Sequence, residues 1–133
     1  MILVDSSILI DYLKGTENKQ TILFDKILDN NIPYGISDYT YQELLQGSKT
    51  TQEFEKLKEY LETLTFYHLQ LGKESFEKAA FLFFQCRKSG ITIRSSIDLL
   101  IAEISIENNL LLLHNDKDFE NMSKVIPELK IYK

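Results

Sequence analysis

The sequence is poor in residues that cross-link or interrupt a chain. Its 133 residues include one cysteine, Cys86, two prolines, five glycines and no tryptophan. A single cysteine excludes an internal disulfide framework and fits a reducing compartment. Sparse glycine and proline are typical of a domain that is mostly helical or α/β.

Two further absences concern membranes and charge. The chain has no apolar run of about 18 residues that could cross a membrane. It also lacks a basic segment followed by an apolar one, which would make a secretory signal. We therefore expect a cytoplasmic protein. The net charge is −5, whereas proteins that bind nucleic acid by charge alone are normally basic. A nucleic-acid enzyme whose acidic residues hold metal ions is not excluded, because the ions reverse the local field.

What the chain does contain is typical of one globular domain. Apolar residues make up 44% and charged residues 26% of the sequence, which is ordinary for a folded protein. The length suits a single domain, and no linker, repeat or low-complexity stretch divides it. We expect one domain over residues 1–133.

Short apolar segments alternate with amphipathic ones along the chain. Strands are predicted at residues 2–4, 33–37, 64–69, 110–114 and 129–132, and helices at residues 6–14, 17–30, 38–46, 50–63, 72–89, 95–108 and 119–123. The inward faces of two helices are predicted as Phe76, Ala79, Ala80, Phe83 and Phe84, and as Ile97, Leu100, Ile101 and Ile104. The alternation predicts a parallel sheet with helices on both faces.

Acidic side chains stand just after several predicted strands, where ligands bind in open α/β sheets. Asp5 follows the first strand, and Asp116 and Asp118 follow the strand at 110–114. Glu43 lies in the helix after the second strand, and Asp98 near the start of the helix 95–108. Neighbouring carboxylates repel unless cations join them, and oxygen ligands suit Mg²⁺ or Mn²⁺. Such ions activate water for attack on a phosphodiester.

Each acid also has a purely structural interpretation. Asp5 and the acids of residues 116–118 could only cap the helices that follow them. Asp98 could pair with Ser95 in a capping box, and Glu43 could be a solvated helix residue. Helix caps alone do not explain acids at three separate strand-to-helix transitions, and a capping acid can also be a ligand.

Four segments together resemble the PIN domain, and within it the VapC toxins of bacterial toxin–antitoxin pairs. They are "ILVDSSILIDYLKG", "QELLQG", "SIDLLIAEISIENNLLLLHNDKDF" and "LKIY". The resemblance covers nearly the whole chain, and its third segment is the most specific. It implies a PIN-like three-layer α/β/α fold with a central, mostly parallel sheet of about five strands.

The resemblance also implies roles for individual residues. The catalytic acids would be Asp5, Glu43, Asp98 and a fourth that falls on Asp116 or Asp118, with Asp116 favoured. Of these, Asp5, Asp98 and Asp116 would hold Mg²⁺ or Mn²⁺. Ser6, Asn115 and Asp118 would support them, Asp118 either beside the acids or as a helix N-cap. We also expect Arg87, Lys88, Arg94 and Lys117 to contact RNA phosphates, with a plain solvated surface as the alternative.

The implied activity is endoribonuclease cleavage by a metal-activated water, without a protein nucleophile. It would leave a 3′-hydroxyl and a 5′-phosphate on single-stranded or loop RNA, with tRNA or ribosomal RNA as the expected target. The implied partners are a VapB-type antitoxin, a second copy of the chain and a higher toxin–antitoxin complex. Tyr39, Tyr41 and the helix 50–63 are expected to form the antitoxin groove. His114 is expected to be structural, with a modulating base as the alternative.

Other functions on a similar sheet compete with this interpretation. A metal-dependent phosphatase of the haloacid dehalogenase type needs a second Asp two residues after the first, where Ser7 stands. A receiver domain needs an acid pair after the first strand, where there is only Asp5. A catalytically inactive PIN-fold interaction module stays open, and it would tolerate Asp98→Asn without loss of effect.

Overall fold

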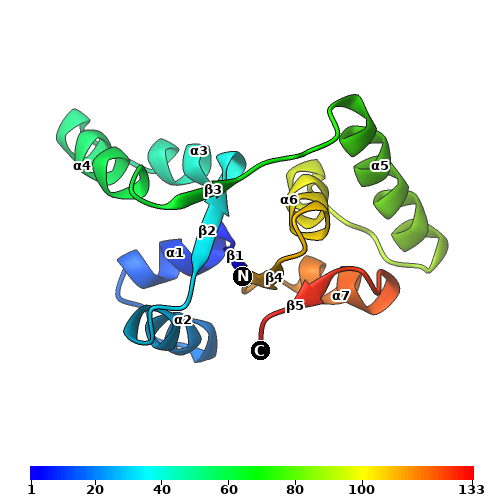
Figure 1. Ribbon diagram of the computed structural model, residues 1–133, viewed down its shortest axis with the longest axis horizontal. Helices are drawn as coiled ribbons and strands as arrows, with labels where there is room; N and C mark the ends of the chain where they lie inside the picture. The colour runs from blue at the N-terminus through cyan, green and yellow to red at the C-terminus, as the bar shows by residue number, and fades with distance from the viewer.

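A computed structural model describes residues 1–133, and its strands and helices alternate along the chain (Figure 1). The strands are β1 (Ile2–Val4), β2 (Tyr34–Ser37), β3 (Thr65–Tyr67), β4 (Leu111–Leu113) and β5 (Lys130–Ile131). The helices are α1 (Ser6–Leu13), α2 (Lys19–Asp29), α3 (Asp38–Gln46), α4 (Thr51–Leu61), α5 (Lys73–Lys88), α6 (Ser96–Glu107) and α7 (Lys117–Val125). Every predicted element is present, with ends that differ from the prediction by two residues at most.

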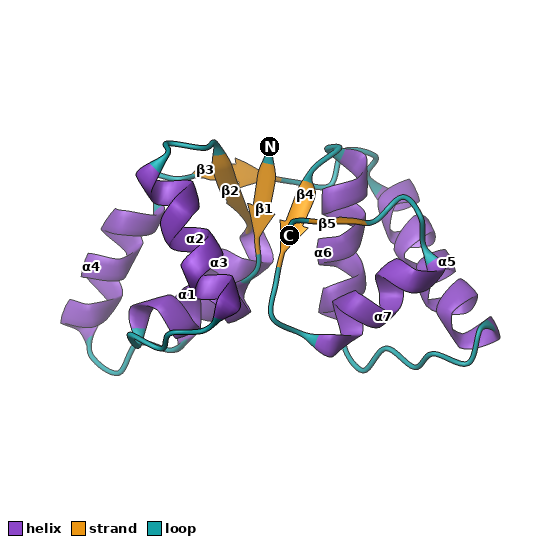
Figure 2. Cartoon of the chain, turned by 90° about the horizontal axis from the view of Figure 1, so that it is seen from below, coloured by secondary structure: helices purple, strands orange, loops and turns teal.

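The five strands form one parallel sheet in the order β3-β2-β1-β4-β5. Helices α1 to α4 cover one face and α5 to α7 the other, as the edge-on view shows (Figure 2). The predicted three-layer α/β/α fold is therefore confirmed. Strand β1 is central, and the chain builds outward from it first through β2 and then through β4. The carboxyl ends of β1 and β4 thus form the switch point at which such sheets bind ligands.

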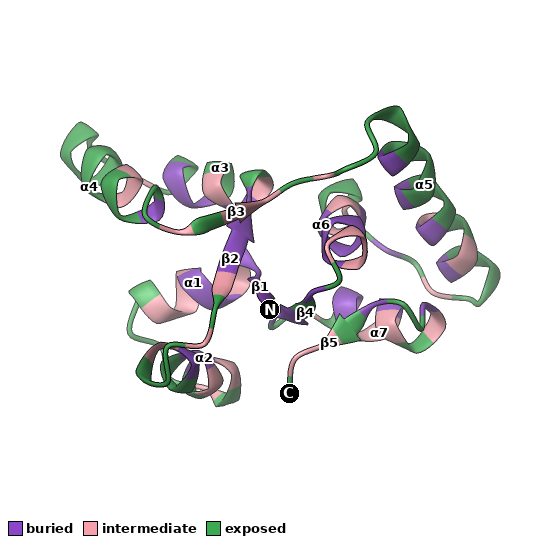
Figure 3. Cartoon of the chain, in the orientation of Figure 1, coloured by how far each residue is buried: buried purple, intermediate pink, exposed green.

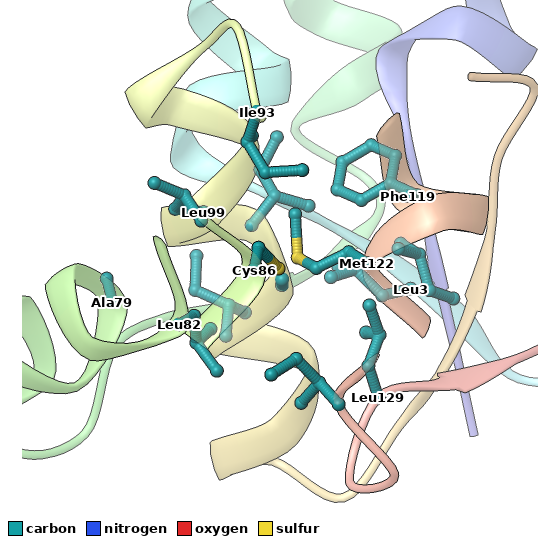
Figure 4. Close-up of a cluster of buried hydrophobic side chains, with 14 of the residues drawn as sticks. Leu3, Ala79, Leu82, Cys86, Ile93, Leu99, Phe119, Met122 and Leu129 are labelled. Atoms are coloured by element: carbon teal, nitrogen blue, oxygen red, sulfur yellow. The ribbon is translucent and has the colours of Figure 1, made fainter. Parts of the chain in front are cut away.

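Strand β1 separates two hydrophobic cores. Ile2 and Val4 pack into a core with α1 to α4, whereas Leu3 packs into the core with α5 to α7. This alternation is the period of two that a strand imposes on its side chains. Figure 4 shows the second core, where Cys86 and Leu82 of α5 lie beside Met122 of α7. No helix of the structure has the length and apolar character needed to cross a membrane.

The predicted inward face of α5 is right for Ala79 and in part for Phe83, which packs against the core, and wrong for Phe76, Ala80 and Phe84. Phe76 and Phe84 are 52% and 47% exposed, and the buried stripe consists of Ser75, Ala79, Leu82 and Cys86. Helix α5 is the outermost helix of its layer, and its exposed side faces away from α6 (Figure 3). Small side chains on the inner face let α5 approach α6 closely, and this turns the larger phenylalanines outward. Ile97, predicted to face inward, is likewise exposed in the first turn of α6.

Helix α6 buries an acid that the apolar pattern did not reveal. Glu103 is only 3% exposed, one turn from Glu107. Burial first, and then the hydrogen bond and charge of Glu107, raise the pKa of Glu103 to about 8. Glu107 is anchored by the backbone N–H of Gln70 and by the Ser75 hydroxyl, at 2.6 and 3.0 Å. The pair therefore shares a proton at neutral pH.

We expect this pair to make the fold less stable in alkali. The pKa of Glu103 lies above its ordinary value of 4.5 in the folded chain. Its stabilising proton is therefore fully present below that value and is lost as the pH rises toward 8. Glu103→Gln should gain thermal stability over the wild type by about 5 °C at pH 8 and little at pH 5, measured by circular dichroism. Glu59→Gln, on the exposed side of α4, should show no such trend. A constant difference across pH would contradict the shared proton.

Candidate active site

Asp5 occupies the centre of the carboxyl edge of the sheet. It follows β1, caps α1 and is 5% exposed. Its Oδ2 accepts hydrogen bonds from the Ser7 backbone N–H at 3.2 Å and from the Ser7 hydroxyl at 2.7 Å. Burial raises the pKa of Asp5, the Ser7 hydrogen bonds oppose that rise, and the charge of Glu43 adds to it. Asp5 is therefore both a helix cap and a buried acid held in one orientation.

Glu43 reaches the same place from α3. The buried hydroxyl of Ser6 donates a hydrogen bond to Glu43 Oε1 at 2.9 Å. This contact joins the start of α1 to the middle of α3. Although Glu43 as a whole is exposed, the Ser6 hydroxyl orients its carboxylate toward Asp5.

The raised pKa of Asp98 is the most direct sign that the acids lie close together. Asp98 lies half-buried in the first turn of α6. Burial raises its pKa to about 7, followed in order by the charges of Asp5, Asp116, Asp118 and Glu43. The capping-box alternative is wrong, because Ser95 makes no side-chain cap hydrogen bond. Five carboxylates, from three helices and two strand ends, therefore act on one another electrostatically.

Asp116 and Asp118 have different structural partners. Asp116 caps α7, and its Oδ1 accepts the Asp118 backbone N–H at 2.9 Å. Asp118, predicted as the alternative cap, does not cap this helix. Its buried Oδ2 accepts hydrogen bonds from the backbone N–H and the Nε of Arg94, both at 3.3 Å. Asp118 thus ties the loop before α6 to α7, whereas Asp116 exerts the larger charge effect on Asp98.

The turn after β4 is fixed by its own side chains. His114 is buried, and its Nδ1 accepts the Asp116 backbone N–H at 3.0 Å. Burial lowers the pKa of His114, so the ring is neutral and has a structural contact, as expected. The backbone N–H of Asn115 donates to the Ser7 hydroxyl at 3.1 Å. The Ser7 hydroxyl therefore positions both Asp5 and the turn after β4. This role was not predicted for Ser7, the second serine of the opening Asp–Ser–Ser.

The four cations predicted to contact RNA are all exposed, but they lie in two places. Arg94 contacts Asp118, and Lys117 is the first residue of α7, next to Asp116. Arg87 and Lys88 instead lie over the rings of Phe83 and Phe84 on α5, at 5.3 and 5.9 Å from the ring centroids.

The donor set at this edge fits a hard divalent ion, because every candidate ligand is a carboxylate oxygen. The site has the negative charge that such an ion would neutralise, as the pKa of Asp98 shows. No group of three His, Cys, Asp or Glu side chains in the structure lies close enough together to hold an ion.

A groove runs from Glu43 along α1, α3 and α4. It has a volume of about 960 Å³, and its lining includes Ile10, Leu13, Leu44, Leu57 and Tyr60. The helix predicted at 50–63 therefore contributes to a groove, as expected. Tyr41 does not line it, because its ring packs edge-on against Phe66 at 5.1 Å. Tyr39 lies on the other side of Glu43, near Ile97.

Comparison with known proteins identifies similar chains and folds. Residues 2–125 match the family model described as PIN domain. The chain is 24% identical over 126 residues to Ribonuclease VapC11 of Mycobacterium tuberculosis, an alignment that covers 94% of this chain and 93% of the relative. It has the same identity and coverage with VapC ribonuclease Mb1587 of Mycobacterium bovis.

Among solved structures, similar folds occur in VapBC-1 from nontypeable Haemophilus influenzae and in VapBC2 from Rickettsia felis bound to a promoter DNA fragment. The Haemophilus chain has a TM-score of 0.70 and 25% identity, with coverage of 99% of this chain and 97% of that one. The Rickettsia chain has a TM-score of 0.73 and 24% identity, with coverage of 99% and 98%.

Asp98→Asn should stabilise the metal-free protein. The folded pKa of Asp98, about 7, lies above its ordinary value of 3.8, so its stabilising proton is lost as the pH rises through 7. In EDTA at pH 8 the variant should unfold at least about 3 °C above the wild type, with a smaller gain at pH 5. Mg²⁺ or Mn²⁺ should raise the wild-type midpoint more than that of the variant.

The matched control is Asp25→Asn on the exposed side of α2. Its midpoint should follow that of the wild type in EDTA and with either ion. A lower midpoint for Asp98→Asn than for the wild type in EDTA at pH 8 would show that Asp98 is not under charge repulsion.

Proposed function

Because the chain belongs to the PIN domain family, we propose that it is a metal-dependent endoribonuclease and the toxin of a VapC-type toxin–antitoxin pair. The observation that carries the proposal is the convergence of acids on Asp98 at the carboxyl edge of the sheet. The relatives named as ribonucleases support the reaction class. A phosphatase has less support, because Ser7 stands where its second acid would be and holds Asp5 in place.

In this proposal Asp5, Asp98 and Asp116 hold Mg²⁺ or Mn²⁺. When bound, the ion would lower the pKa of a water molecule and stabilise the leaving oxygen. Burial and the Ser7 hydrogen bonds fix the carboxylate of Asp5. Asp98, with its raised pKa, must release a proton for an ion to bind, so ion affinity rises with pH.

Glu43 is the residue placed to handle a proton. Its Oε1 is occupied by the Ser6 hydroxyl, and its other oxygen, Oε2, is available to accept a proton from the attacking water. Arg94 and Lys117, both exposed beside the acids, are placed to contact phosphates of the RNA strand. The expected targets, tRNA or ribosomal RNA, offer single-stranded loops whose bases are accessible.

The groove along α1, α3 and α4 is the surface that we propose for the antitoxin. Its apolar lining suits the apolar face of a partner helix. Glu43 stands at one end, where the groove meets the acid cluster. A basic side chain that extends from the partner would be attracted there and would replace the cation. The Haemophilus and Rickettsia neighbours are VapBC structures by name, and another similar fold is named as a toxin–antitoxin complex from Klebsiella pneumoniae, which supports this kind of partner.

We also propose a homodimer through the exposed side of α5. Phe81 and Phe84 are 56% and 47% exposed, and their rings stack at 5.7 Å. Two copies of α5 packed antiparallel across a two-fold axis would cover this aromatic face on both chains.

The nuclease proposal predicts RNA cleavage that depends on both ion and acids. The purified chain, freed of any partner, should cut a pool of tRNA and ribosomal RNA with Mg²⁺ or Mn²⁺ and not with EDTA. Asp5→Asn and Asp98→Asn should each lower the rate by at least about 100-fold. Sequencing of the fragment ends reports the cut site and the terminal groups.

Asp25→Asn is the matched control and should cleave like the wild type. Complex with the antitoxin should suppress cleavage by the wild type. Cleavage that persists in EDTA or in Asp98→Asn would rule out the proposed mechanism. A wild type that binds the ions yet cuts no RNA would favour the inactive interaction module.

The dimer proposal predicts that charge placed on the aromatic face separates the copies. The wild type should sediment as a dimer at micromolar concentration, and Phe81→Glu with Phe84→Glu should sediment as a monomer. The control, Ile22→Glu with Phe54→Glu, adds the same charge at other exposed apolar positions and should stay dimeric. A monomeric wild type, or a dimeric α5 variant, would rule out this interface.

A further inference from the structure

A second cavity opens beside the acid cluster, on the side away from the antitoxin groove. It has a volume of about 480 Å³ and lies between the first turns of α2 and α7 and the strand β5. This size is within the range of about 300–1,000 Å³ that is usual for small-molecule sites. Asp116 belongs both to the cavity wall and to the acid cluster, so a strand held at the acids continues directly into the cavity.

The cavity collects positive charge in an unusual way. Lys19 and Lys117 are the first residues of α2 and α7, and both line it. The first turn of a helix carries partial positive charge, so a cation there is less favourable than an acid. Two helices begin with lysine at this cavity, although a lysine at that position makes each helix less stable. They concentrate positive potential in a chain whose net charge is −5. Such a potential suits an anion.

The wall holds three lysines, Lys19, Lys117 and Lys133, against two acids, Asp116 and Glu120. Lys133 Nζ lies 4.0 Å from Glu120 Oε1, and the buried Oε2 of Glu120 has no hydrogen-bond partner. Asp116 uses Oδ1 to cap α7. Lys19 and Lys117 form no ion pair in the structure, since all ion pairs present involve other side chains.

The rest of the cavity has one aromatic ring in its wall, that of Tyr132, which also packs in part against the core beneath α1 to α4. Tyr132 is half-buried, and its backbone N–H donates to the Leu112 carbonyl at 2.9 Å, which fixes the residue against β4. Leu23 and Ile131 add apolar surface. Aromatic side chains next to cations are the usual means of holding single-stranded nucleic acid without regard to sequence.

We infer that this cavity is a subsite for one nucleotide of single-stranded RNA, next to the bond that is cut. Lys19 and Lys117 bind its phosphate, and its base stacks on Tyr132. The inference rests on the proposed nuclease function and extends it, because it says where the strand continues after the acid cluster. An acidic peptide would use the lysines but would leave the ring of Tyr132 uncovered.

The test measures RNA binding in EDTA, where cleavage is off. A short fluorescein-labelled single-stranded RNA is titrated at several salt concentrations and followed by anisotropy. Lys19→Ala with Lys117→Ala should weaken binding about tenfold and lower the salt slope by about 0.7, since both lysines bind one phosphate and each phosphate contact on a single strand contributes about 0.7. Tyr132→Ala should weaken binding without a change in slope.

The matched control is Lys26→Ala with Lys124→Ala. These lysines are exposed in the last turns of the same two helices, so the control loses the same charge and should bind within about twofold of the wild type. Removal of a cation from a helix N-terminus does not destabilise the helix. Weaker RNA binding by the first pair therefore cannot come from unfolding, which circular dichroism verifies.

Three outcomes would overturn the subsite. One is equal loss of RNA affinity in the test and control pairs, and another is a wild type that binds no RNA at low salt. The third is a test pair that binds RNA normally but loses affinity for a labelled polyglutamate peptide, which would assign the cavity to a protein partner. Failure of the nuclease proposal is distinguishable, because that is read from ion-dependent cleavage by the wild type.

Discussion

Mutual repulsion between carboxylates at the carboxyl edge of the sheet is the constraint around which the rest of the structure is arranged. Asp98 experiences the charges of Asp5, Asp116, Asp118 and Glu43. Nothing in the local sequence brings these acids together, since more than 90 residues separate Asp5 from Asp98. The two cores on either side of the sheet hold them in place. The free energy of apolar burial on both faces therefore offsets an arrangement that is unfavourable until a cation binds.

The same residues serve as helix caps and as members of the acid cluster. Asp5 caps α1 and Asp116 caps α7, and in both cases one part of the carboxylate is engaged by the backbone. A capped acid has a fixed orientation, because its hydrogen bond to the helix N-terminus selects one rotamer. The structural and functional interpretations of these acids therefore support each other. Asp98 differs, because it lies within the first turn of α6, where the helix dipole favours an acid, and Ser95 gives it no cap hydrogen bond.

The positions of the strands, helices and acids could be predicted from the sequence because each depends on local pattern and chain order. Gly47 ends α3 where predicted, and the acids follow the strands in the expected places. The side of α5 that is buried could not be predicted, because both the phenylalanine stripe and the Ser75–Cys86 stripe have helical spacing. Only the neighbouring helix α6 selects between them. The buried Glu103 likewise depends on how α6 packs against its neighbours, as in the hydrogen bonds of Glu107 with Gln70 and Ser75, which a linear pattern does not contain.

Because the chain is synthesised from its N-terminus, the sheet topology determines the order in which the parts of the site are completed. Strand β1 is made first, yet one of its two neighbours is β4, with Ile2 paired to Leu111. All residues that line the groove along α1, α3 and α4 have been made by Tyr60, whereas Asp98 and Asp116 emerge from the ribosome much later. A growing chain surrounded by ribosomal RNA thus carries Asp5 and Glu43 without the acids that complete the site. The surface that we propose for an inhibitor is synthesised before the site that the inhibitor would silence.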